Sequence, residues 1–176
     1  MSRFHVLVLL ASLMVIPPRC EPQHQQRFED WHRRGLKQNP AGLTVKLHTR
    51  DNTDRYAASE RVNLQLSITS LSDTLYEVET AGMSGDEVVL QGSNTDKPRI
   101  SVDKYGIACC SSAVKPLSKN PVNVATRLYL HLRPGEYSLF VKTKRVSRGG
   151  AKPGHYADAL LVTSDVLHLT ITPDHN

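Results

Sequence analysis

The sequence predicts an all-β protein whose antiparallel strands form two sheets stacked face to face. Apolar and polar residues alternate along several short segments, and Gly, Pro, Asn, Asp and Ser residues typical of turns separate these segments. No segment between them has the period and length of a connecting helix, whereas parallel strands need connections of about a dozen residues or more. Stacking two sheets removes the apolar rows of both from water. We therefore expect an antiparallel β-sandwich of roughly seven to eight strands.

The first half of the expected domain contains a series of strands that begins at Leu43. The clearest of them follows the turn-rich segment 51–59, where Val62, Leu64, Leu66 and Ile68 alternate with polar residues. The strands expected in this half are 43–49, 62–69, 75–80 and 87–91. Small and polar residues at 70–74 and 81–86 predict the remaining turns.

The second half starts with a short strand at Ile100 and Val102, followed by a long loop at 104–123 without a regular period. Further strands are expected at 127–132, 137–142 and 166–171. The pair Pro134-Gly135 predicts the turn between the first two of these. The segment from Lys144 to His155 is rich in glycine and cations and is expected to be a loop.

Length and composition indicate one folded domain. With 176 residues, of which 39% are hydrophobic and 22% charged, the chain can bury a core of its own. This balance excludes a chain that is disordered throughout, and the 10 Gly and 10 Pro residues exclude a collagen-like architecture.

The N-terminus has the pattern of an export signal. Residues from Val6 to Ile16 carry no charge, and Pro17-Pro18 end this run well short of the roughly 20 residues that span a bilayer. We expect a signal peptide at 1–20, a polar lead-in segment at 21–42 with one short helical turn at most, and the folded domain at 43–176. The protein is then secreted or periplasmic, with an uncleaved membrane anchor as the alternative.

The positive charge of the chain does not indicate a nucleic-acid partner. Removal of residues 1–20 takes away Arg3 and Arg19 and lowers the formal net charge from +5 to +3. A mild excess of this size is far from the strongly basic surface that nucleic-acid binding requires, and an exported protein works away from nucleic acid.

The cysteines do not form the framework of a disulfide-rich scaffold, because the chain contains only Cys20, Cys109 and Cys110. Three arrangements remain open for the adjacent pair. Cys109 and Cys110 can form a strained ring with each other, one of them can pair with Cys20, or both can be free thiols available for redox chemistry or a metal.

No pattern of catalytic residues is present, so we expect no enzyme, no cofactor and no small-molecule substrate. The nucleophile elbow Gly-x-Ser-x-Gly is absent, since Ser84 lies between glycines at a different spacing. Imidazoles at His48, His131 and His168 fall opposite the apolar rows of their strands, and they would bind a metal only if the fold brought them together. The expected state is solvated side chains, without a metal site.

Three segments resemble bacterial immunoglobulin-like modules. Residues 132–141 resemble the penultimate strand of these modules, with a Pro-Gly turn before an inward tyrosine, and 163–171 resemble the last strand. Residues 60–77 resemble the second strand and the hairpin after it. The resemblance implies an immunoglobulin-like sandwich, and it extends distantly to the intracellular proteinase inhibitors of the bacillus type. Inhibition is therefore an alternative function, although no inhibitory loop is recognisable and the Cys-Trp-Cys pin of antibody domains is absent.

The most distinctive surface candidate is the basic segment near the C-terminus. Its members are Lys144, Arg145, Arg148, Lys152 and His155. A cationic loop on a rigid scaffold suits an anionic partner, while the same charges can also protect a strand edge from pairing. With the loop 104–121 as a second surface, we expect an exported, non-enzymatic module that contacts a protein or an envelope component. A proteinase inhibitor, and a metal or thiol-redox site at Cys109 and Cys110 or the strand histidines, are the alternatives.

Overall fold

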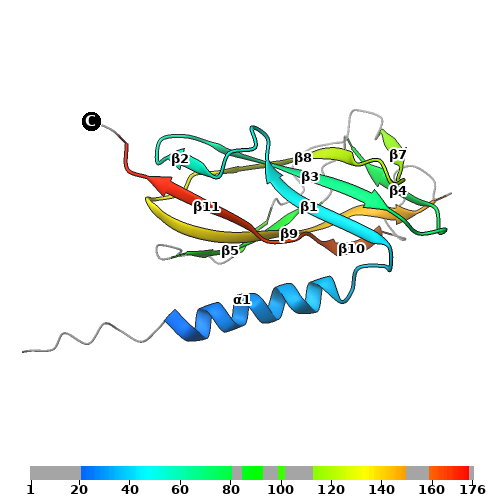
Figure 1. Ribbon diagram of the computed structural model, residues 1–176, viewed down its shortest axis with the longest axis horizontal. Coiled ribbons are helices and arrows are strands. Elements are labelled where there is room, and N and C mark those ends of the chain that lie inside the picture. The colour runs from blue at the N-terminus through cyan, green and yellow to red at the C-terminus, as the bar shows by residue number, and fades with distance from the viewer. Residues whose placement is uncertain (1–20, 81–84, 93–98, 102–112, 150–158, 175–176) are drawn as a thin grey trace, which may run out of the picture.

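A computed structural model describes residues 21–80, 85–92, 99–101, 113–149 and 159–174. The expected signal peptide at 1–20, with Cys20, lies outside these residues. The described part consists mostly of β-strands arranged in two sheets, with one helix before them (Figure 1). No helix among the described residues is long and apolar enough to cross a membrane.

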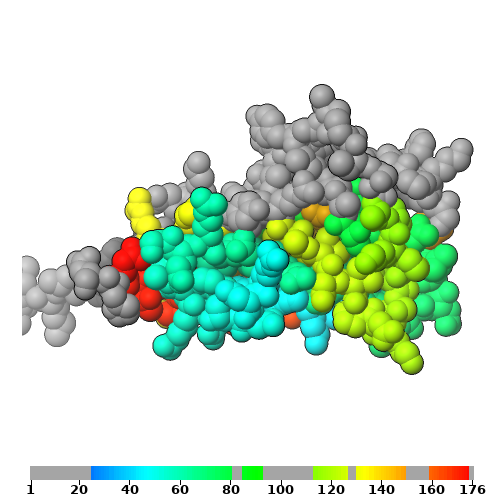
Figure 2. Space-filling model, turned by 90° about the horizontal axis from the view of Figure 1, so that it is seen from above, coloured from blue at the N-terminus to red at the C-terminus, as the bar shows by residue number. Residues whose placement is uncertain are grey.

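The first sheet contains three antiparallel strands in the order β1, β3, β8. These are β1 (Leu43–Thr49), β3 (Val62–Ser70) and β8 (Val122–Leu130). Every second residue of β1 and β3 is buried, which confirms the alternation expected from the sequence. Figure 2 looks onto this sheet from the side away from the helix.

The second sheet is built around β9 (Gly135–Arg148), which pairs with different strands along its two halves. Its first half lies between β11 (Leu167–Thr172) and β5 (Glu87–Gly92). Its second half lies between β10 (Ala159–Thr163) and β4 (Tyr76–Glu79). All four of these partners run antiparallel to β9.

Three short strands complete the second sheet. In it, β6 (Arg99–Ser101) pairs with β5, and β7 (Val114–Pro116) pairs with β4. The third, β2 (Arg55–Ala57), pairs in parallel with β11, so the expectation of purely antiparallel pairing is wrong for this one pair. β2 and β7 were not expected from the sequence, because three-residue strands show no measurable period, whereas β6 overlaps the short strand expected at Ile100 and Val102. Together with β10, they raise the strand count above the seven to eight that the sequence predicted.

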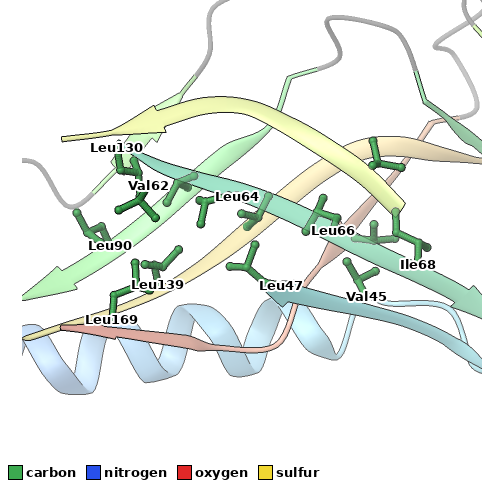
Figure 3. Close-up of a cluster of buried hydrophobic side chains, with 14 of the residues drawn as sticks. Val45, Leu47, Val62, Leu64, Leu66, Ile68, Leu90, Leu130, Leu139 and Leu169 are labelled. Carbon is green, nitrogen blue, oxygen red and sulfur yellow. The ribbon is translucent and has the colours of Figure 1, made fainter. Parts of the chain in front are cut away.

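A single apolar core lies between the two sheets (Figure 3). Leu66 and Ile68 of β3 are fully buried against the second sheet, whose Val78 and Leu139 are equally inaccessible to solvent. The inward rows of both sheets contribute to the same cluster, so each sheet covers the apolar face of the other.

The helix α1 (Glu21–Leu36) occupies the segment that was expected to be a polar lead-in, so the prediction of at most one helical turn is wrong. Phe28 is buried against Val89 and Phe140 on the outer face of the second sheet, and Trp31 packs beside it. One turn further along, Gly35 approaches Thr163 so closely that an added Cβ would lie 2.4 Å from its Oγ1. Phe28 and Trp31 therefore lie on the face of the helix that the sheet covers, whereas Leu36 at its end is exposed.

The C-terminal half also differs from expectation in its strand boundaries. The strand β9 continues to Arg148 and β10 follows at Ala159, where the sequence predicted a loop from Lys144 onward. The register shows why: Leu160 pairs with Val146 and Val162 with Thr143, so Lys144 and Arg145 together lie opposite Leu161. This bulge shifts the alternation by one residue and conceals the strand from a search for a two-residue period.

Candidate functional site

Connections that are distant in sequence meet at one end of the two sheets, on the right in Figure 1. The N–H of Gly149, just after β9, donates to the carbonyl of Leu75 at 2.7 Å, and the N–H of Ser70 donates to the carbonyl of Ser118 at 2.9 Å. These bonds join the turn between β3 and β4 to the end of β9 and to the segment between β7 and β8. We refer to residues 70–75, 113–121, Arg148 and Gly149 together as the loop surface.

The turn 71–75 is held in place at both ends. The N–H of Leu71 donates to the carbonyl of Gly42 at 2.8 Å, and Leu75 accepts the bond from Gly149. Within the turn, the N–H of Ser72 donates to Ser70 Oγ at 3.3 Å and the N–H of Thr74 donates to Ser72 Oγ at 3.1 Å. Such serine turns, closed by side-chain hydroxyls, fix the backbone of this short connection.

The turn presents apolar side chains to solvent. Leu71 is 76% exposed and Leu75 is 56% exposed, and Val114 on the neighbouring β7 is 36% exposed. In Figure 2 the atoms of this turn and those of 113–121 gather at the same right-hand end. Two large apolar side chains this exposed on one short turn are typical of an interaction surface.

Cations lie on both sides of β4, which leads out of this turn. Arg148 is exposed and pairs in register with Tyr76 from the β9 side, while Lys115 is exposed and pairs with Val78 from the β7 side. Lys119 is also exposed. The structure thus brings part of the predicted basic segment next to part of the predicted loop 104–121, which the sequence had left as separate surfaces.

Arg145 is the predicted binding residue that the structure places elsewhere. Its side chain is 2% exposed and forms an ion pair with Asp86, whose side chain is 1% exposed. Therefore the prediction that Arg145 belongs to an exposed basic surface is wrong. Its neighbour Lys144 is exposed, as is Arg148, while Lys152 and His155 lie outside the described residues.

Both oxygens of the buried Asp86 carboxylate accept hydrogen bonds from Arg145 or Thr143. Arg145 Nε lies 3.1 Å from both carboxylate oxygens, Arg145 Nη2 donates to Oδ2 at 2.9 Å, and Thr143 Oγ1 donates to Oδ1 at 2.7 Å. The sequence did contain a signal for this site, because Asp86 continues the buried row of Val88 and Leu90. An acidic residue in a row of core positions indicates a buried partner of opposite charge.

The remaining candidates of the sequence do not meet in one place. His48 lies on the first sheet with its Nε2 3.2 Å from Ser67 Oγ, whereas His168 lies on the second sheet with its Nδ1 2.9 Å from Ser138 Oγ. Over the residues the structure describes, no group of three or more His, Cys, Asp and Glu side chains is placed to hold a metal ion. Cys109 and Cys110 lie outside the described residues.

Polar groups at the opposite end of the sheets serve the fold. The Tyr56 hydroxyl donates to Asp51 Oδ1, and this bond holds the pKa of the Asp51 carboxyl below its usual value. Burial, together with the carboxylate, raises the pKa of Tyr56 to about 12. At the same end the Tyr137 hydroxyl donates to the carbonyl of Arg133 at 2.8 Å, and burial raises its pKa as well.

No known family model matches this chain, and no curated protein matches it. One similar solved structure is the X-ray structure of a Northeast Structural Genomics Consortium target. The two share 9% sequence identity with a TM-score of 0.39, over 76% of this chain and 92% of that one.

Proposed function

We propose that this chain is an exported, immunoglobulin-like module without enzymatic activity, and that its loop surface binds a protein or an envelope component. The observation that carries the proposal is the convergence of Leu71, Leu75, Lys115 and Arg148 on one end of a rigid pair of sheets. Loops fixed on such a scaffold are a common location of binding sites.

The strand order supports an immunoglobulin-like topology. In chain order, β1, β3 and β8 take the places of strands A, B and E in one sheet, while β9 takes that of F in the other. Strands β4 and β5 pair along one side of β9 as strand C does, and β10 and β11 pair along its other side as strand G does. The turn 71–75 then corresponds to the B–C connection, and Gly149 begins the F–G connection.

Tyr137 adds independent support for this topology. Immunoglobulin-like domains have a tyrosine near the start of strand F whose hydroxyl bonds to the backbone a few residues upstream. Tyr137 lies near the start of β9 and its hydroxyl bonds to the Arg133 carbonyl, four residues upstream. Two residues later antibody domains have a cysteine, where this chain has the fully buried Leu139.

The polar groups of the described residues support binding in preference to catalysis. Ser67 has a histidine neighbour, but its hydroxyl donates to Asn123 Oδ1 at 2.5 Å, and the group lies on the outer face of the first sheet. The carboxylates of Asp86 and Asp51 are each occupied by hydrogen bonds within the fold. No observation in the described residues favours the proteinase-inhibitor alternative.

Site-specific cross-linking tests the proposal. A photo-reactive amino acid is placed at Lys119 on the loop surface, and at Arg61 in a matched control at the opposite end; both positions are exposed. The purified variants are irradiated with envelope and secreted fractions of the source organism. We expect discrete cross-linked products at position 119 that are absent at position 61. Equal labelling at the two positions, or none at 119, contradicts the proposal.

A further inference from the structure

We infer that the turn 71–75 is the anchor of this binding surface, and that its partner is a protein with an apolar pocket surrounded by carboxylates. The inference rests on the proposed function and adds to it the anchoring residues and the chemistry of the partner. Leu71 and Leu75 are exposed by 76% and 56%, more than any other large apolar side chain for which exposure is described. A few side chains that enter pockets near the centre of an interface supply most of its affinity.

The backbone around these leucines is already ordered before a partner binds. Leu71 and Leu75 each take part in a backbone hydrogen bond to another segment, and two serine hydroxyls bond to amides inside the turn. Gly149 gives Leu75 room, because an added Cβ would lie 2.4 Å from the Leu75 Cγ. A turn ordered in this way loses little conformational entropy on binding, as an anchor requires.

The charges beside the turn determine the sign of the charge expected on the partner's surface. Lys115, Lys119 and Arg148 are exposed on the loop surface, and Asp73 is the single acidic residue within it. Glu77 and Glu79 of the adjacent β4 alternate with Tyr76 and Val78, the residues with which Arg148 and Lys115 pair, so the two glutamates lie on the other face of the sheet. Cations around an apolar centre attract a partner whose pocket is surrounded by carboxylates, and they repel basic surfaces. An apolar membrane does not fit this pattern, since two leucines on a short turn bury too little surface to anchor a domain in lipid.

A random peptide library displayed on phage is the probe for this inference. The library is selected on the full chain, and the enriched peptides are then tested for binding to the double variant L71S/L75S. We expect the enriched peptides to combine large apolar residues with Asp or Glu. Their affinity for the double variant should be lower than their affinity for the wild type by a factor of about ten or more. Leu161→Ser is the matched control, because Leu161 is 38% exposed on β10 and outside the loop surface, and it should bind the peptides as the wild type does.

Several outcomes overturn the inference. Enriched peptides that bind L71S/L75S as tightly as the wild type exclude the leucines as the anchor, and peptides without carboxylates exclude an acidic partner. A wild-type chain that dimerises in sedimentation velocity, with L71S/L75S a monomer, shows that a second copy occupies the surface. Thermal unfolding of each variant shows whether a loss of binding comes from a loss of folding. The single variant L71S, at the more exposed of the two positions, is measured as well. Cross-linking at position 119 that persists in L71S/L75S refutes the anchor while leaving the proposed function intact.

Discussion

At the scale of single residues, the burial of Arg145 changes how the basic segment is understood. Arg145 and its neighbours Lys144 and Arg148 look alike in the sequence, yet Arg145 points to a buried carboxylate and the other two are exposed. A charge reversal that included Arg145 would therefore damage the fold together with the surface. Of the two exposed residues, Arg148 lies on the loop surface, so it is the position at which binding can be tested separately from stability.

The ion pair predicts a large stability difference between neighbouring residues. Replacing Arg145 by alanine leaves the Asp86 carboxylate buried without its guanidinium partner, and we expect a loss of about 3 to 5 kcal/mol in the free energy of unfolding. The exposed Lys144→Ala variant should lose no more than about 0.5 kcal/mol. Urea unfolding of the full chain measures both. Similar losses in the two variants would show that the pair contributes nothing beyond a surface charge.

At the scale of elements, α1 depends on the sheet beneath it. Its contacts include the packing of Phe28 on Phe140, with ring centroids 5.1 Å apart, and the hydrogen bond between His32 Nε2 and the carbonyl of Ser164, just after β10, at 2.9 Å. After the helix, Asn39 bonds to both the N–H and the carbonyl of Thr163. An isolated helix of this length is marginal in water, so these contacts are what keep it helical.

Removing the central contact of the helix should therefore release α1 alone. In Phe28→Ala we expect the amides of 21–36 to exchange with deuterium much faster, while those of β3 and β9 keep the protection they have in the wild type. Hydrogen exchange followed by mass spectrometry measures this segment by segment. The exposed Gln26→Ala variant is the control. Unchanged protection of 21–36 in Phe28→Ala would mean that the helix is held by its other contacts.

At the scale of the whole molecule, the connection between β10 and β11, residues 164–166, forms hydrogen bonds to both sheets. Ser164 Oγ accepts the N–H of Val141 at 2.9 Å in the second sheet. The next residue reaches the first sheet, where the N–H of Asp165 donates to the Val45 carbonyl and Asp165 Oδ1 accepts the N–H of Leu47 at 2.6 Å. Asp165 thereby takes the place of a neighbouring strand at the edge of β1 and protects this edge from other chains.

The hydrogen bonds of Asp165 predict that two substitutions of this residue differ in their effect on the free energy of unfolding. Asp165→Ala removes the acceptor of the Leu47 amide and should lower the free energy of unfolding by about 1 to 3 kcal/mol. Asp165→Asn keeps an oxygen at that position and should retain most of the stability. Urea unfolding at neutral pH separates the two variants. If asparagine were as destabilising as alanine, the carboxylate charge and not the hydrogen bond would hold the sheets together.

The sequence by itself determined the strands whose two faces differ. Segments such as 43–49 and 62–69 have an apolar side and a polar side, and a period of two identifies them without knowledge of any partner. The Pro134-Gly135 turn and the strand after it were predictable for the same reason, since local residues suffice to specify them. The arrangement in two sheets followed from the need to bury these rows.

Only the tertiary structure decided the features that depend on a distant partner. α1 needs Phe140 beneath Phe28, the β9 bulge needs β10 opposite it, and Arg145 is buried because Asp86, 59 residues away in sequence, lies beside it. The loop surface depends in the same way on hydrogen bonds between segments that are far apart, such as Gly149 with Leu75. Local patterns report the environment of a residue along the chain, whereas these features arise from contacts that exist only once the sheets have formed.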